Sequence, residues 1–69
     1  MNMRLLVNGL SLPVAQLGPD FVFLDEPVNH GPATATMVME IDSSERRWSV
    51  RLPNGISAEN TRVQIAAVS

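Results

Sequence analysis

Turn-forming residues recur so often along this chain that no long helix fits between them. They stand at Asn8-Gly9, Gly18-Pro19, Pro27, Gly31-Pro32 and Pro53-Asn54-Gly55. The apolar runs between them are about five to nine residues long and rich in β-branched and aromatic residues, which favour strands. No window of a dozen residues keeps apolar positions three and four apart, as a helix would. The pattern predicts an all-β meander of five or six antiparallel strands.

The first pair of apolar runs predicts a hairpin around Asn8-Gly9. A two-residue type I′ turn needs a positive φ at both central positions, and asparagine followed by glycine tolerates this well. The turn sets the register, with Val7 opposite Leu10 and Leu5 opposite Leu12 on one face of the sheet. We expect that face to join the core.

The clearest predicted element is a second hairpin, in which residues 34–41 and 46–52 keep a period of two. A four-residue loop over Asp42-Ser43-Ser44-Glu45 predicts its register. That register sets Ile41 opposite Arg46, Met39 opposite Trp48, Met37 opposite Val50 and Ala35 opposite Leu52. It also predicts an exposed ion pair between Glu40 and Arg47 on the solvent side.

The run Phe21-Val22-Phe23-Leu24 is apolar at four successive positions. Both faces of such a strand must be covered, so it is either a central strand or part of an interface. We therefore take Val22 and Leu24, together with an edge strand, as a candidate contact surface. Residues 62–67 alternate again and predict a last strand.

A length of 69 residues leaves room for one domain, residues 1–69, and for one hydrophobic core. We expect a small partly open barrel or a two-layer sandwich. Ordering the chain costs roughly 1.5 kcal/mol per residue, and without cysteines no disulfide offsets that cost. A protein partner or a second copy is the source of extra stability that needs no special residues, so we expect an oligomer or a subunit.

Charge and hydropathy disfavour several classes of partner. The net charge is −2, with five basic and seven acidic residues, whereas nucleic-acid and anionic-membrane binders carry a basic excess. The apolar run Leu5-Leu6-Val7 is too short for a signal peptide, and no stretch approaches the roughly 20 apolar residues of a spanning helix. We expect a cytoplasmic protein that binds neither nucleic acid nor membrane.

The residues that could carry chemistry form no recognisable active site. His30 is the only histidine, and Asp25 and Glu26 are its nearest acidic neighbours. Metal sites in small domains usually show paired cysteines or histidines at fixed spacing, so we predict no metal and a solvated loop histidine. The chain also lacks a Walker A sequence, a GxGxxG loop and a nucleophile elbow, and we predict neither a cofactor nor enzyme activity.

One basic patch with an aromatic residue stands out, at Arg46, Arg47, Trp48 and Arg51. Guanidinium groups suit phosphate and carboxylate recognition. Strand alternation places Arg47 and Arg51 on one face and Trp48 on the other, so we expect no stacking platform that joins them. Arg47 and Arg51 are the candidate site for an anionic small molecule.

The stretch Arg47-Trp48-Ser49-Val50-Arg51 is similar to the RxxxR motif of PilZ domains, small β-barrels that bind cyclic di-GMP. In that family the motif lies nearer the N-terminus and precedes a strand of pattern D/N-x-S-x-x-G. Here it lies late in the chain, and Asn54-Gly55-Ile56-Ser57-Ala58-Glu59 departs from the pattern. The resemblance covers five of 69 residues, and we do not assign the chain to the family.

The sequence therefore supports two hypotheses from different classes. The leading one is a non-enzymatic interaction module that self-associates or forms a subunit of a larger assembly. The alternative is a ligand-binding module for an anionic small molecule or nucleotide, with Arg47 and Arg51 as its contacts.

Overall fold

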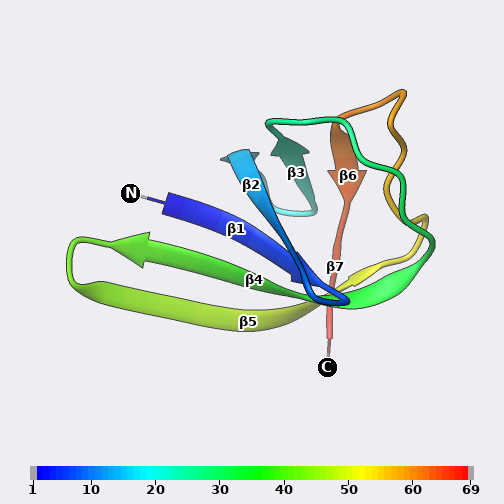
Figure 1. Cartoon of the computed structure of the whole chain (residues 1–69). Helices are drawn as coiled ribbons and strands as arrows, with labels where there is room; N and C mark the ends of the chain where they lie inside the picture. The colour runs from blue at the N-terminus through cyan, green and yellow to red at the C-terminus, as the bar shows by residue number, and fades with distance from the viewer. Residues whose placement is uncertain (1, 69) are drawn as a thin grey trace.

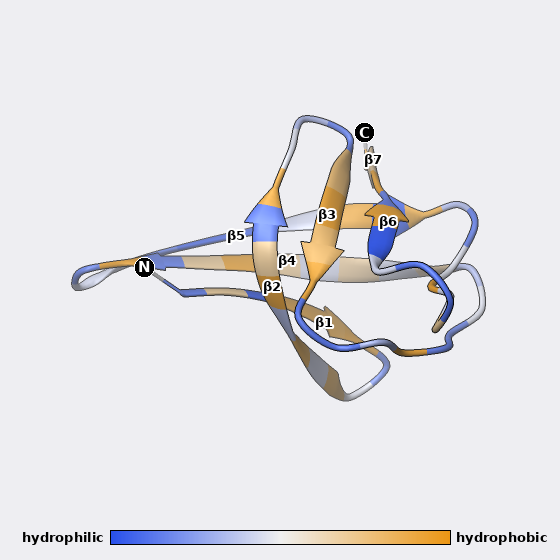
Figure 2. Cartoon of the chain, turned by 90° about the horizontal axis from the view of Figure 1, so that it is seen from above, coloured by the Kyte–Doolittle hydropathy of each residue, from blue (hydrophilic) through white to orange (hydrophobic). Residues whose placement is uncertain are grey.

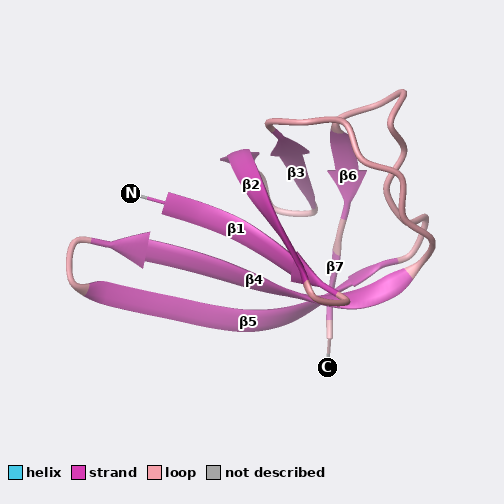
Figure 3. Cartoon of the chain, in the orientation of Figure 1, coloured by secondary structure: helices cyan, strands magenta, loops and turns pink. Residues whose placement is uncertain are grey.

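The computed structural model describes residues 2–68, which form seven antiparallel strands and no helix (Figures 1 and 3). The strands are β1 Asn2–Val7, β2 Leu10–Leu17, β3 Phe21–Leu24, β4 Ala33–Ile41, β5 Ser44–Leu52, β6 Arg62–Gln64 and β7 Ala66–Ala67. The all-β prediction is confirmed. One strand more than predicted arises because the last expected strand divides at Ile65. Within residues 2–68 there is consequently no helical segment that could cross a bilayer.

All seven strands belong to one sheet with the order β6-β3-β2-β1-β4-β5-β7. The sheet curls into a half-barrel (Figure 1). The first and last strands of this order, β6 and β7, follow each other in the chain with only Ile65 between them. The C-terminal segment thus pairs with β3 through β6 and with β5 through β7.

The first hairpin has the predicted turn and register. Asn8 and Gly9 have φ values of 47° and 82°, the left-handed values that a type I′ turn requires at both positions. Val7 lies opposite Leu10 and Leu5 opposite Leu12. The register prediction is confirmed. On its other side β1 pairs with β4, where Leu5 lies opposite Met37.

The core lines the inner face of the half-barrel. Six strand segments each contribute two inward side chains two positions apart, as the strand period requires. These pairs are Leu5 and Val7, Leu12 and Val14, Val22 and Leu24, Ala35 and Met37, Val50 and Leu52, and Val63 and Ile65. Ile56, from the loop after β5, completes the core cluster.

Strand β3 lies between β2 and β6, second from one end of the strand order, and Figure 2 shows it hydrophobic along its length. Val22 and Leu24 face the core, and Phe21 and Phe23 lie half-buried on the other side. The guanidinium of Arg62 lies 4.8 Å from the centre of the Phe21 ring. Such a cation over an aromatic face covers part of the outer surface that an all-apolar strand would otherwise expose.

The long loop between β5 and β6 is tied to the segment before β4. His30 and Ile56 exchange backbone hydrogen bonds of 2.9 and 2.7 Å. Gly55 precedes Ile56 with a φ of 68°, and its amide donates to the Leu52 carbonyl at 3.1 Å. This tight turn directs Ile56 into the core.

Candidate functional site

The hairpin of β4 and β5 extends beyond the rest of the sheet (Figures 1 and 2). Only Asp42 and Ser43 connect its strands, because Ile41 lies directly opposite Ser44. Asp42 has a φ of 55°, a left-handed conformation that aspartate tolerates because its side chain is short and polar. The predicted four-residue loop is wrong.

The shorter turn moves β5 by two residues relative to β4. Ala35 lies opposite Val50, Met37 opposite Trp48 and Met39 opposite Arg46, where the sequence predicted Leu52, Val50 and Trp48. Because side chains alternate with a period of two, a two-residue shift leaves each one on its predicted face. The face assignments are therefore correct while the cross-strand partners are not.

The inner face of the sheet continues onto the projecting hairpin as an apolar surface. Met3 and Met39 lie opposite each other and are half-buried. Ile41 is 44% exposed and Trp48 36% exposed. We call these four residues the apolar tip. They lie on the same face as Met37. Met3 packs against the core cluster, and Met39, Ile41 and Trp48 lie outside it.

The outer face of the same hairpin carries charges. Arg4 donates to Glu40 at 3.0 Å, and Arg47 donates to both carboxylate oxygens of Glu45 at 3.2 Å. Glu40 and Glu45 lie directly opposite each other, a like-charge pairing that is unfavourable without nearby cations. The hydrogen bond that Arg47 donates to Glu45, and then the negative charge of Glu45, raise the pKa of Arg47. The predicted Glu40–Arg47 pair is wrong.

Val38 is 1% exposed although it lies on the outer face, outside the core cluster. Its cross-strand neighbours are Arg4 on one side and Arg47 on the other. The alkyl stems of long basic side chains cover apolar surface while their charged ends stay in water. Arg4 and Arg47 thus serve packing as well as charge.

Strand β5 has an unpaired outer edge over most of its length. Strand β7 pairs with it only at Val50 and Arg51, and no other strand in residues 2–68 covers the rest. Ile41 and Ser44 close a two-residue turn and so form a hydrogen-bonded pair, after which bonded and non-bonded pairs alternate. The backbone N–H and C=O groups of Glu45 and Arg47 therefore point outward from the sheet.

Similarity to known proteins adds no further constraint on this site. The chain matches no family model, no curated protein and no solved structure.

Arg47 and Arg51 lie on one face of β5, as predicted. They are four positions apart along the strand, which places their Cα atoms about 13 Å apart. The guanidinium of Arg47 is held by Glu45, and Arg51 lies opposite Thr34, nearer the other end of the hairpin. The structure does not bring these two residues into one site, and the anion-binding hypothesis stays a prediction.

Val22 and Leu24 are 0% and 4% exposed. Both belong to the core cluster. A partner could contact these side chains only if the half-barrel opened. The large apolar side chains that are exposed are instead Ile41 and Trp48 of the apolar tip, together with Leu10 and Val68.

His30 is held by its neighbours rather than directed into a cavity. Its Nδ1 lies 2.7 Å from the Gly31 carbonyl oxygen and its Nε2 lies 3.1 Å from the Asn8 side-chain nitrogen. The ring therefore donates from Nδ1 and accepts at Nε2, which links the first hairpin to the loop before β4. No group of three His, Cys, Asp or Glu side chains suited to a metal occurs within residues 2–68.

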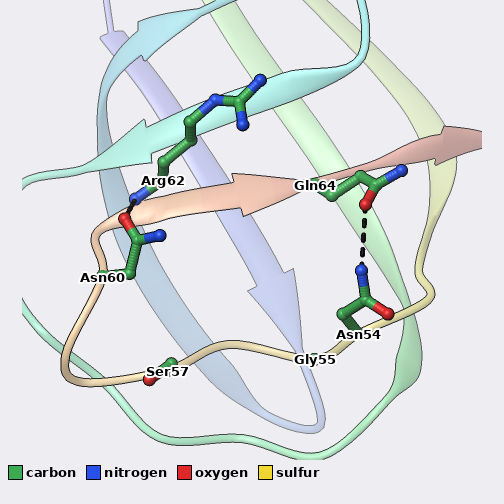
Figure 4. A pocket seen from close by; sticks show the side chains of 6 residues that line it. All are labelled: Asn54, Gly55, Ser57, Asn60, Arg62 and Gln64. Carbon is green, nitrogen blue, oxygen red and sulfur yellow. Dashed lines mark hydrogen bonds between the residues drawn. The ribbon is translucent and has the colours of Figure 1, made fainter.

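A shallow polar hollow of about 240 Å³ lies beside the loop after β5 (Figure 4). It is lined by Asn54, Gly55, Ser57, Asn60, Arg62 and Gln64. Asn54 donates to Gln64 at 2.9 Å, and Asn60 accepts from the Arg62 amide at 3.0 Å. Figure 4 shows the Arg62 guanidinium directed away from the Asn54–Gln64 pair. These contacts fix the loop and leave no convergent set of groups for a ligand.

Sequence reasoning missed Ile41 and Trp48 as exposed residues, and it missed the open edge at Glu45. Alternation correctly gave their faces, but exposure depends on how far each strand extends past its neighbours. One signal was present: Asp42 tolerates a left-handed φ and so permits a two-residue turn.

Proposed function

We propose that this chain is a non-enzymatic protein-interaction module that adds an extended strand of a protein partner to the outer edge of β5. The supporting observation is that one strand carries both an unpaired backbone edge, at Glu45 and Arg47, and an exposed tryptophan, Trp48. In strand addition, main-chain hydrogen bonds supply affinity and side-chain contacts supply specificity. The apolar tip supplies such contacts on the inner face.

The size of this edge predicts a weak interaction. The four outward groups of Glu45 and Arg47 offer four hydrogen bonds, each worth about 0.5–1.5 kcal/mol net. Association costs about 4–15 kcal/mol, so burial of Trp48 and its neighbours must supply the remainder. We expect dissociation constants between about 1 μM and 1 mM.

The test uses ¹⁵N-labelled chain and a capped peptide of alternating valine and threonine with a lysine at each end. We expect the peptide to slow amide hydrogen exchange at Glu45 and Arg47, because both N–H groups gain an acceptor. The amides of β6, at the other end of the strand order, serve as an internal control and should not change.

Arg47→Pro should abolish this binding, because proline lacks the outward N–H but keeps the strand at an edge position. Arg47→Ala is the matched control, since it removes the side chain and keeps the N–H. Peptide binding that survives Arg47→Pro, or that protects β6 instead of β5, would show that the β5 edge is not the binding site. The cytoplasmic location stays a prediction.

A further inference from the structure

We infer that the strand added at the β5 edge is the β5 strand of a second copy of this chain, paired antiparallel about a twofold axis at Arg46. This inference rests on the proposed function and names its partner. In this arrangement Glu45 lies opposite the partner's Arg47, and Arg47 lies opposite the partner's Glu45.

Backbone geometry limits the registers that a symmetric pair can adopt. The outward groups belong to odd-numbered residues, so Glu45 or Arg47 must meet an odd-numbered residue of the partner. With Arg46 on the axis, all four outward groups of Glu45 and Arg47 find partners. The pairing ends before Val50, where β7 already occupies the edge.

The charges of the outer face favour this register over its neighbours. Glu45 lies beside Glu40 within the sheet, and the new pairing sets the partner's Arg47 on its other side. An axis at Arg47 would place two arginines opposite each other and leave Glu45 opposite a serine. An axis at Glu45 would place two carboxylates opposite each other, which is unfavourable.

The inner face of the pair joins the two apolar tips. Trp48 lies opposite the partner's Ser44, a small side chain that leaves room for the indole ring. Arg46 lies opposite the partner's Arg46 and diagonal to the partner's Trp48. A guanidinium over an indole face is a favourable arrangement and offsets the repulsion at the axis.

The first experiment exchanges the two charges between copies. Glu45→Arg alone and Arg47→Glu alone each set like charges opposite each other, so each variant should sediment at the 7.5 kDa chain mass. An equimolar mixture should restore a species of twice that mass, because each introduced charge then meets its opposite. Sedimentation equilibrium is run up to about 1 mM, the weak end of the expected affinity range.

A second experiment does not depend on the stability of those variants. Arg46→Cys sets the two cysteines opposite each other at the axis, about 4.5 Å apart at Cα, within the range of a disulfide. We expect rapid formation of a covalent dimer on mild oxidation. Ser43→Cys, in the exposed turn, is the control and should cross-link far more slowly.

The outcomes separate this inference from the proposed function. A wild-type chain that stays at 7.5 kDa but binds the valine and threonine peptide at Glu45 would overturn self-pairing and keep strand addition. A chain that does neither overturns both, and the charges of β5 then act to prevent edge pairing. A wild-type dimer without rescue in the mixture, or without preferential cross-linking at Arg46→Cys, overturns the register.

Discussion

Replacing Gly55 by alanine should destabilise the fold more than replacing Gly9, the other glycine with a positive φ. Gly55 has a φ of 68°, and an added Cβ would overlap the His30 carbonyl oxygen and lie 2.8 Å from the Gly31 carbonyl carbon. Those neighbours are backbone atoms, which cannot rotate away. The His30–Ile56 pairing must therefore open or shift.

The expected loss is about 3 kcal/mol. A left-handed conformation costs an alanine about 1–2 kcal/mol, of which about 0.4–1 kcal/mol is recovered because alanine restricts the unfolded chain. Loss of the two backbone hydrogen bonds between His30 and Ile56 adds about 0.5–1.5 kcal/mol each. A small domain has about 0.05–0.15 kcal/mol of stability per residue, so this loss is a large fraction of the total.

The matched control is Gly9→Ala. Gly9 also has a positive φ, 82°, but no atom lies within 4 Å of the position of an added Cβ. This variant retains only the conformational cost, about 1 kcal/mol. Urea unfolding followed by far-ultraviolet circular dichroism measures both, since the signal reports the loss of strand structure in this all-β fold. Equal losses for the two variants would refute the argument from backbone overlap.

Three further predictions concern the sheet itself. Met37→Ala should lower the free energy of unfolding by about 2–5 kcal/mol, measured in urea, because Met37 is 0% exposed at the centre of the core; a loss under about 1 kcal/mol would mean that the half-barrel collapses around the cavity. Asp42→Gly should raise the thermal midpoint, because glycine adopts the φ of 55° without steric cost, and Asp42→Val should lower it; the reverse order would argue against the two-residue turn. Glu40→Gln should change stability by less than about 1 kcal/mol in urea, since its bond to Arg4 is exposed and its loss also relieves the repulsion with Glu45; a larger loss would show that the pair is worth more than its exposure indicates.

In both hairpins the sequence correctly predicted the face of the sheet on which each side chain lies, but it predicted the cross-strand partners only in the first. The first hairpin was correct to the residue because Asn8-Gly9 fixes both turn type and register. In the second hairpin, loops of two and of four residues preserve the same alternation, so the pattern could not choose between them. The division of the last strand could not be predicted for a similar reason. Residues 62–67 alternate as a single strand would, yet β6 and β7 pair at opposite ends of the sheet.

The candidate site was predicted only in part. The sequence pointed to the correct strand through Arg47, but it could not show that Glu45 holds that side chain. It also could not tell which of the two apolar faces of β3 lies inward, and the structure buries Val22 and Leu24 rather than exposing them. Such outcomes depend on strand lengths and sheet curvature, which are properties of the whole fold.

Residues 62–68 form one continuous segment that pairs with β3 through β6 and with β5 through β7. Val63 and Ile65 hold this segment in the core, where they are 2% and 6% exposed. If local unfolding releases them, β3 and the remainder of β5 become edges at the same moment, one at each end of the strand order. A sheet with two newly opened ends can add chains in both directions. Mutations that loosen Val63 should therefore promote polymerisation before global unfolding.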